Sequence, residues 1–456
     1  MDAVLNFVGW LTGIVWGPPM LILLVGGGLW LSLELKFFQF RYFPYIVGQT
    51  FGKIFTKPEG EGTVTPFQSV TAALASTVGA SNIIGVPAAI MFGGPGAIFW
   101  MWVIAFVGMG SKFAETVLGV KYREKNEEGE FVGGPMYYMK KGLNSKVLAG
   151  IFAFGLMIEL VPSVMVQANS VASSASTAFN LSPLVSGIIM AVMVSLVVVG
   201  GIKRIGRVTE KLVPFMSILY LLGAIIIIIS NIDKVPAAFG LIFSSAFRPA
   251  AAVGGFGGAA FAAVVRWGVA RGAYSNEAGM GTAPMAHSAA ITDHPVRQGF
   301  WGVFEVIIDT LVICTITALV ILTSGLWLEE GAAADPSALP AMAFGEMFGP
   351  MGGAVVTFSL LAFVISTIIV IIFYGEKQAE YLFGTAFSKK WIYVYIVSIV
   401  IGAVGAAEIL WHFLDILLAG IIIPNMIAII LLRKEVVELT KEFFTSDKYY
   451  LKDIKK

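Results

Sequence analysis

Hydroxyl and amide side chains interrupt one of the most apolar stretches of this 456-residue chain. Residues 76–87 read STVGASNIIGVP, and their flanks suit a membrane helix. Such residues offer hydrogen bonds and oxygen ligands for cations. Tight helix packing accounts for the small residues, but it does not account for the amide of Asn82. Since lipid satisfies no backbone groups, we predict that the helix breaks here, beside a bound solute.

A second irregular stretch, residues 250–290, is rich in Gly and Ala and still contains charged residues. It holds Arg266, Arg271, Asn276 and Glu277. A charge at bilayer depth is costly unless it is paired or lines a cavity. We therefore expect two half-helices around an unwound link within 254–282, with Glu277 near the cytoplasm.

The elements that position these residues are expected to be membrane helices. The chain is 57% hydrophobic and 13% charged, with a mean hydropathy of +0.85, whereas soluble proteins carry about 25% charged residues. About 20 apolar residues cross a bilayer. We predict an all-α polytopic membrane protein with eleven transmembrane helices. The spans cover 13–33, 66–91, 94–120, 147–179, 182–201, 210–230, 249–285, 299–326, 341–373, 391–409 and 411–432.

Basic residues divide unequally between the two sides of this topology. One set of alternate loops, together with the C-terminal tail, holds nearly all the Lys and Arg outside the spans. The opposite side holds only Lys234 and Arg248. Because basic loops stay in the cytoplasm, we predict a multi-pass protein of the cell membrane, with its N-terminus outside and its C-terminus inside.

The eleven spans contain a positional symmetry. After the first span, two sets of five remain, and each set opens with a discontinuous, Gly-rich span. Such a pair indicates an inverted-repeat transporter with its substrate at the breaks. We predict an extra N-terminal helix and connector (1–65), a first repeat (66–230), a second, inverted repeat (231–432) and a cytoplasmic tail (433–456).

Other classes of protein lack their signals in this sequence. A net charge of +1 gives no indication of nucleic acid as a partner, and no P-loop motif indicates a nucleotide. The single Cys314 excludes an intramolecular disulfide. A channel remains an alternative, although two interrupted repeats favour alternating access. An intramembrane enzyme would need a nucleophile and a base, or a metal cluster, and no such constellation is evident.

Three longer motifs resemble the alanine/glycine:cation symporter family over most of the chain. They are GGPGAIFWMWVIAFVG (93–108), GGPMYYM (133–139) and SNEAGMGTAPMAHSAA (275–290). STVGASNI (76–83) is similar to the unwound first core helix of sodium-coupled transporters with the LeuT fold. The resemblance implies a LeuT-type 5+5 inverted repeat plus one extra N-terminal helix. It also implies sodium- or proton-coupled symport of small neutral amino acids such as alanine and glycine, without an organic cofactor.

An amino acid needs donors for its carboxylate and acceptors for its ammonium group. Oriented N–H groups at a helix break bind carboxylates. The candidates at the first break are the backbone of Gly79, Ala80 and Ser81 and the side chains of Thr77 and Asn82. The other candidates are polar or lie at the second break: Gln167, Asn169, Tyr274, Asn276, Met280, Gly281 and Thr282. Gln167 and Asn169 lie in the middle of one span, two residues and therefore about 200° apart around the helix, so one helix face cannot present both side chains.

Two adjacent hydroxyls, Ser366 and Thr367, interrupt an aliphatic span. Hydrogen bonds to the carbonyls one turn earlier are the structural alternative for such residues. The family resemblance makes them half of a sodium site, and carbonyls near Ala75 and Val78 form the other half. We prefer sodium to protons because neither break centre is expected to offer an acid; in a proton-coupled alternative, Asp309 or Glu277 carries the proton.

Two further expectations concern supporting structure. Lys112 lies near the cytoplasmic end of its span, where it is expected to extend toward water or to pair with Glu115. Residues 121–146 contain Gly133, Gly134 and Pro135, and we expect a solvated loop with an interfacial helix there.

Overall fold

A computed structural model describes residues 11, 13–247, 261–329, 336–405 and 407–450. These residues are almost entirely helical, apart from turns and one two-stranded hairpin. Within the expected irregular span 249–285, the Gly-rich residues up to 260 lie outside the described part.

The first discontinuous span is present where the sequence predicts it. It consists of α6 (Pro66–Thr77), the π-helical turn η3 (Ser81–Gly85) and α7 (Val86–Gly93), and its two halves are bent by 48°. Val78 adopts an extended conformation that ends α6. The Gly79 amide donates to Asn82 Oδ1 at 2.9 Å, so a side chain replaces a lost helical bond. The break at 78–79 confirms the prediction.

The segments before α6 are short helices. Pro18–Glu34 is one apolar stretch formed by α2 (Pro18–Leu21), η1 (Ile22–Gly26) and α3 (Gly27–Glu34). The connector that follows contains α4 (Phe38–Arg41), α5 (Phe43–Gln49) and η2 (Phe51–Lys53).

Between the two discontinuous spans, long helices alternate with short connections. They are α8 (Ala97–Lys121), α10 (Lys146–Phe179), α11 (Pro183–Val198), α12 (Gly201–Ser230), η4 (Ile232–Lys234) and α13 (Val235–Phe247). The helix α12 begins nine residues before the expected span, and α13 was not expected at all.

The segment after α8 is less exposed than its sequence suggests. It contains a hairpin of β1 (Glu124–Lys125) and β2 (Phe131–Val132) and the helix α9 (Pro135–Lys141). A helix is present in this segment, as expected. The expectation of a solvated loop is wrong for this helix, because the side chains from Pro135 to Met139 are buried in the protein.

The second discontinuous span is interrupted over Glu277–Thr282. The helix α15 (Phe261–Asn276) ends there and α16 (Ala283–His287) begins beyond it. The linking residues have positive φ angles at Glu277 (53°), Gly279 (92°) and Gly281 (79°). Such angles are incompatible with a continuing helix, so the predicted unwound link is confirmed and its position is now defined.

The C-terminal half continues with α17 (Pro295–Val306), η5 (Ile307–Cys314) and α18 (Thr315–Ser324), which form one long helical stretch. The expected span 341–373 is two helices, α19 (Leu339–Phe348) and α20 (Pro350–Phe383). The remaining elements are η6 (Leu326–Leu328), η7 (Pro336–Ala338), α21 (Thr385–Val404), α22 (Ala407–Leu431) and α23 (Arg433–Thr445).

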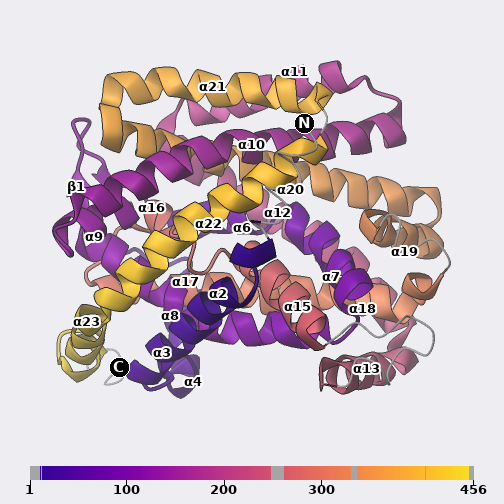
Figure 1. The fold of residues 1–456 in the computed structure, drawn as a ribbon, viewed down its shortest axis with the longest axis horizontal. Coiled ribbons are helices and arrows are strands. Elements are labelled where there is room, and N and C mark those ends of the chain that lie inside the picture. Colours follow the sequence, from indigo (N-terminus) through magenta and orange to yellow (C-terminus); the bar gives the residue numbers. More distant parts are fainter. Residues whose placement is uncertain (1–10, 12, 248–260, 330–335, 406, 451–456) are drawn as a thin grey trace.

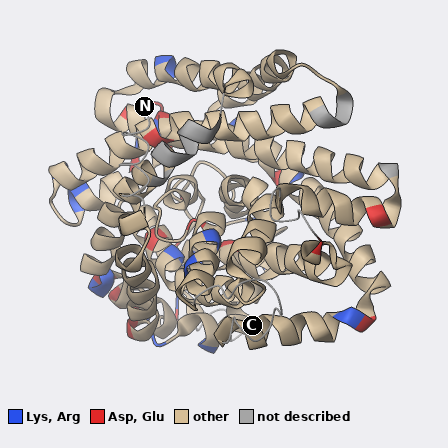
Figure 2. Cartoon of the chain, turned by 45° about the vertical axis from the view of Figure 1, so that its right-hand side comes forward, with Lys and Arg blue, Asp and Glu red and all other residues tan. Residues whose placement is uncertain are grey.

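The helices form two groups around the discontinuous spans. In one group, α10 packs against α20, α21 and α22; in the other, α8 packs against α15 and α17 (Figure 1). Most of the ribbon carries neither Lys and Arg nor Asp and Glu, and many of the charged residues lie near helix ends (Figure 2).

Six described helices are long and apolar enough to cross a membrane, and two bent pairs raise this number to eight. The structure therefore shows an all-helical protein with several potential membrane spans, but not the full predicted count of eleven.

Candidate functional site

A small cavity lies where the two discontinuous spans meet α10 and α20. Its volume is about 40 Å³, which is room for only a few water molecules. Its lining comes from both breaks and from three long helices. The lining residues are Ser76, Gly79, Ser81, Glu159, Leu160, Ser163, Gln167, Tyr274, Glu277, Met280, Thr282, Thr367, Ile371 and Leu418.

Six of the twelve predicted substrate residues lie on this cavity. They are Gly79, Ser81, Gln167, Tyr274, Met280 and Thr282. Gly79 packs closely against α20, because a Cβ atom added to Gly79 would lie 2.9 Å from Thr367 Oγ1. The position therefore suits glycine, and it places the backbone of the first break beside α20.

The other six predicted residues lie outside the cavity lining: Thr77, Ala80, Asn82, Asn169, Asn276 and Gly281. Thr77 bonds back to the carbonyls of Ala73 and Leu74 within its own helix. Asn276 donates to Thr310 Oγ1 at 3.2 Å and accepts from the backbone of Ala278 at 3.0 Å. Thr77 and Asn276 therefore bond to groups beside the breaks and do not line the cavity.

Asn82 joins the first break to the long helical stretch that follows the second break. Its amide nitrogen donates to Asp309 Oδ1 at 2.7 Å and to Ser275 Oγ at 3.1 Å. Asp309 also accepts from Ser275 at 2.8 Å and from Thr310 at 2.7 Å. All four side chains are buried. Asn82 therefore stabilises the first break from a position outside the cavity lining.

The two mid-span amides of α10 separate as their spacing predicts. Gln167 lies on the cavity. Asn169 instead donates to the carbonyls of Gly402 and Gly405 at 3.2 and 2.8 Å, next to the end of α21. Asn169 thus forms an interhelical hydrogen bond of the structural kind.

The two adjacent hydroxyls of α20 also separate. Thr367 Oγ1 donates to the carbonyls of Ala75 and Phe363, both at 2.9 Å. Ser366 Oγ donates to Phe363 at 2.8 Å and contacts Met216 Sδ at 3.4 Å. Of these two hydroxyls, Thr367 is the one that contacts the helix before the first break. Val78 is buried at the end of α6.

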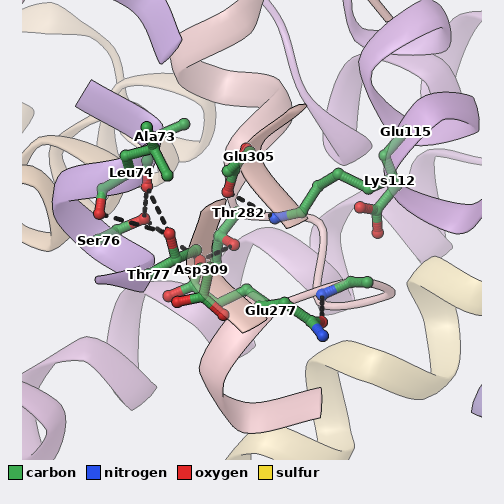
Figure 3. A network of polar contacts seen from close by, with 12 residues as sticks. Ala73, Leu74, Ser76, Thr77, Lys112, Glu115, Glu277, Thr282, Glu305 and Asp309 are labelled. Atoms are coloured by element: carbon green, nitrogen blue, oxygen red, sulfur yellow. Dashed lines mark hydrogen bonds and ion pairs between the residues drawn. The ribbon is translucent and has the colours of Figure 1, made fainter. Parts of the chain in front are cut away.

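Two acidic residues, Glu159 and Glu277, line the cavity. Neither was predicted there from the sequence, and Glu277 was assigned a role only as a proton carrier in the proton-coupled alternative. The expectation that neither break centre offers an acid is wrong, because Glu277 lies in the second break. Glu277 Oε2 accepts from Thr282 Oγ1 at 2.5 Å and from Ser76 Oγ at 3.3 Å (Figure 3). One signal was available: Glu159, Ser163 and Gln167 recur every four residues, which places them on one face of a helix.

A buried ion-pair network lies beside the second break. Lys112 Nζ lies 2.9 Å from Glu305 Oε1, and His287 Nε2 lies 3.2 Å from Glu305 Oε2. All three side chains are fully buried. The expectation that Lys112 reaches water or pairs with Glu115 is wrong, because Glu305 of α17 lies within reach in the protein interior (Figure 3).

Glu115 has a separate role at the second break. Its Oε1 accepts from the Gly281 amide at 3.1 Å and from Asn425 Nδ2 at 2.5 Å. Asn425 also donates to the carbonyl of Gly279 at 2.9 Å and accepts from the Tyr138 hydroxyl. The buried GGPMYYM helix is thereby connected to the unwound link through α22 and α8.

Comparison with known proteins gives three consistent results. Residues 1–455 match the model of the "Sodium:alanine symporter family". All 456 residues align at 55% identity with an uncharacterized transporter, YflA, of Bacillus subtilis, covering 97% of that protein. Over 448 residues the chain is 42% identical to the sodium/alanine symporter AgcS of Methanococcus maripaludis, covering 97% of this chain and 98% of the relative.

A solved structure with a similar fold is that of MhsT in complex with L-phenylalanine, which has the LeuT fold. The TM-score is 0.64 at 15% identity, over 82% of this chain and 89% of that chain. At this identity the similarity establishes the fold alone.

Proposed function

The chain belongs to the sodium:alanine symporter family, and from this membership we propose sodium-coupled symport of small neutral amino acids, alanine and glycine, by alternating access. Its family and its relatives are transporters, not enzymes. One observation supports the proposal above all. The cavity between the two helix breaks is small and lined by polar groups from both breaks and from α10 and α20.

The substrate carboxylate is assigned to the first break. The backbone amide of Ser81, on the cavity, begins the helical stretch Ser81–Gly93, whereas Ala80 precedes this stretch and lies outside the lining. Helix N-termini favour anions. Gly79 contributes close backbone approach, since its own amide is occupied by Asn82. Gln167, Tyr274, Met280 and Thr282 form the rest of the wall, while Thr77, Asn82, Asn169, Asn276 and Gly281 position the framework.

The co-transported sodium ion is assigned to the junction of α6 and α20. Thr367 Oγ1 and the carbonyls of Ala75 and Val78 supply oxygen ligands, which suit a hard cation. The 2.9 Å contact between Thr367 and Ala75 supports this assignment. For Ser366 to contribute, its hydroxyl must turn away from Met216.

The proposal includes the topology expected from the sequence. Eleven spans, with an extra N-terminal helix before two inverted repeats at 66–230 and 231–432, place the N-terminus outside and the C-terminus in the cytoplasm. The distribution of Lys and Arg between alternate loops supports this orientation. Two repeats that move relative to each other would expose the central cavity alternately to the two sides.

A second candidate function, proton-coupled symport, is favoured by the two carboxylates on the cavity, Glu159 and Glu277. Proteoliposome uptake of labelled alanine under separate sodium and proton gradients distinguishes the two. Our proposal expects accumulation with an inward sodium gradient at equal pH on both sides. Accumulation driven by a proton gradient alone, without sodium, would contradict it.

A further inference from the structure

Neither of the two cavity carboxylates, Glu159 and Glu277, forms an ion pair with a described residue. Glu159 is 3% exposed and lines the cavity, and among the described residues it has no hydrogen-bond or ion-pair partner. Glu277 is only partly buried, and its hydrogen-bond partners in the described part are two hydroxyls. The nearby Lys112 is already paired with Glu305 at 2.9 Å. A carboxylate in a membrane interior is costly without a partner, so a positive group is expected in the cavity.

Glu277 is the better anchored of the two. Ser76 of the first break and Thr282 at the end of the second break both donate to its Oε2 atom. These contacts hold the carboxylate where the two discontinuous spans meet. No described residue donates to Oε1, so this atom is available to a donor in the cavity. Glu159 has no comparable contact among the described residues.

The backbone at Glu277 is also unusual. Its φ angle of 53° lies in the left-handed region, which is uncommon for a residue other than glycine. Backbone strain of this kind concentrates at functional sites. Gly279 and Gly281 share positive φ angles, but at position 277 the chain keeps a carboxylate instead of a third glycine. The side chain is therefore the feature to be explained.

We propose that Glu277 binds the ammonium group of the substrate and makes the cavity selective for amino acids over acids that lack an amine. This inference rests on the proposed function and adds the residue that recognises the amine. An ammonium group has three N–H donors and no acceptor, which matches a carboxylate whose hydroxyl donors all lie on one oxygen. The substrate carboxylate then lies toward Ser81, at the first break.

Selectivity follows because an ammonium group gives the Glu277 carboxylate a cationic partner, which an uncharged group cannot do. L-Lactate has the shape of alanine but carries a hydroxyl in place of the ammonium group, and propionate carries neither. A site built around a buried polar group rejects analogues that lack its partner by about 10⁴-fold at its strongest. We expect both acids to bind the parent protein at least about 100-fold more weakly than alanine.

The test uses the full chain, purified and reconstituted in lipid nanodiscs with saturating sodium. Binding of labelled alanine is measured directly, and lactate and propionate are measured as competitors. Glu277→Gln is expected to raise the alanine Kd about 100-fold while changing lactate binding little. Glu159→Gln is the matched control in the same cavity, and its effect is expected to be several-fold smaller. Glu277→Asp keeps the charge and is expected to preserve the preference for alanine over lactate.

Several results would overturn the inference. An alanine Kd in Glu277→Gln within about twofold of the parent would exclude the role. A parallel loss of alanine and lactate binding would show a structural effect, and a changed sodium requirement with an unchanged alanine Kd at saturating sodium would assign the carboxylate to the ion.

If Glu277→Gln does not fold, the parent protein still tests the inference. Lactate binding to the parent within about tenfold of alanine binding would then reject the role of Glu277 in recognising the amine. A parent that binds neither alanine nor glycine would instead refute the proposed function on which the inference depends.

Discussion

At the scale of single residues, the polar residues predicted for the site divide into those that line the cavity and those that lie outside its lining. Asn82 belongs to the second kind, since its amide holds both the Gly79 backbone and Asp309. Gly79 and Thr367 belong to the first kind. Substitutions at these two kinds of position should therefore differ in what they change.

Asn82→Ala should impair both alanine binding and stability, while the protein still reaches the membrane. The substitution removes the side-chain donor to Asp309 Oδ1 and the acceptor for the Gly79 amide, although Asp309 Oδ2 keeps Ser275 and Thr310. Each buried group left unsatisfied costs about 1–3 kcal/mol. Alanine binding and thermal unfolding of the purified protein measure the two effects. Asn169→Ala removes a similar amide that bonds two carbonyls near α21, so it should lower stability alone. Parent-like alanine binding by Asn82→Ala would show that the residue serves packing only.

Thr367→Val should weaken sodium binding much more than alanine binding at saturating sodium. Valine keeps the branched shape but removes the oxygen that lies 2.9 Å from the Ala75 carbonyl. Loss of one ligand is expected to raise the sodium concentration for half-maximal alanine binding by about tenfold. Ser366→Ala is the matched control and should have a smaller effect, because Ser366 faces Met216. Equal sodium dependence in Thr367→Val and the parent would exclude this threonine as a ligand.

The sequence alone identified the first break and half of the cavity residues, and the reason for the failures is geometric. A small polar residue in an apolar run shows that a helix is interrupted, but it does not show which way a side chain turns. Asn82 and Gln167 carry the same kind of amide, yet Asn82 bonds to Asp309 outside the cavity lining and Gln167 lines the cavity. Glu277 was misjudged because the break in 254–282 had no defined position.

At the scale of elements, buried polar side chains fix the ends of helices around the second break. Glu115 of α8 and Asn425 of α22 hold the backbone of Gly281 and Gly279. Tyr138 of α9 contacts the same asparagine. Hydropathy could not predict this connection, because α9 is only seven residues long and its burial depends on helices that are distant in the sequence.

The N-terminus of α17 should make stability depend on pH. His294 caps this helix outside the span, and its Nδ1 accepts from the Val296 amide at 3.2 Å. Burial lowers the pKa of His294 below its ordinary value, although Glu442 opposes the shift. The folded state therefore favours neutral histidine. Its stabilising contribution is complete above the unfolded pKa of about 6.5 and is lost as the pH falls.

Thermal unfolding measured from about pH 7 to about pH 5 tests this cap. The parent should lose stability over this interval. His294→Asn keeps an acceptor for the Val296 amide and removes the titrating group, so it should lose less. An identical dependence on pH in the two proteins would show that other groups cause the acid sensitivity.

At the scale of the whole molecule, the two groups of helices meet at the cavity, and the ion and the substrate share one piece of backbone. Residues 75–79 connect the proposed sodium ligands to the carboxylate site, and α20 contacts both. The paired discontinuous spans were predictable from the sequence because each contains glycines and polar residues at a matching position. The count of eleven spans stays a prediction. Within the described residues, α19 is a separate helix where one span, 341–373, was expected, and α13 lies outside all the expected spans.

This shared backbone predicts reciprocal coupling between sodium and alanine. An ion that orders residues 75–79 should favour the arrangement that binds alanine, and alanine should favour the same arrangement. Saturating sodium is then expected to lower the alanine Kd by about 5- to 150-fold, and saturating alanine must lower the sodium Kd by the same factor. Calorimetry of each ligand with and without the other measures both factors on the full chain. An alanine Kd that ignores sodium but changes with pH would exclude this coupling and would assign the driving ion to a proton on Glu277 or Glu159, the two acids on the cavity.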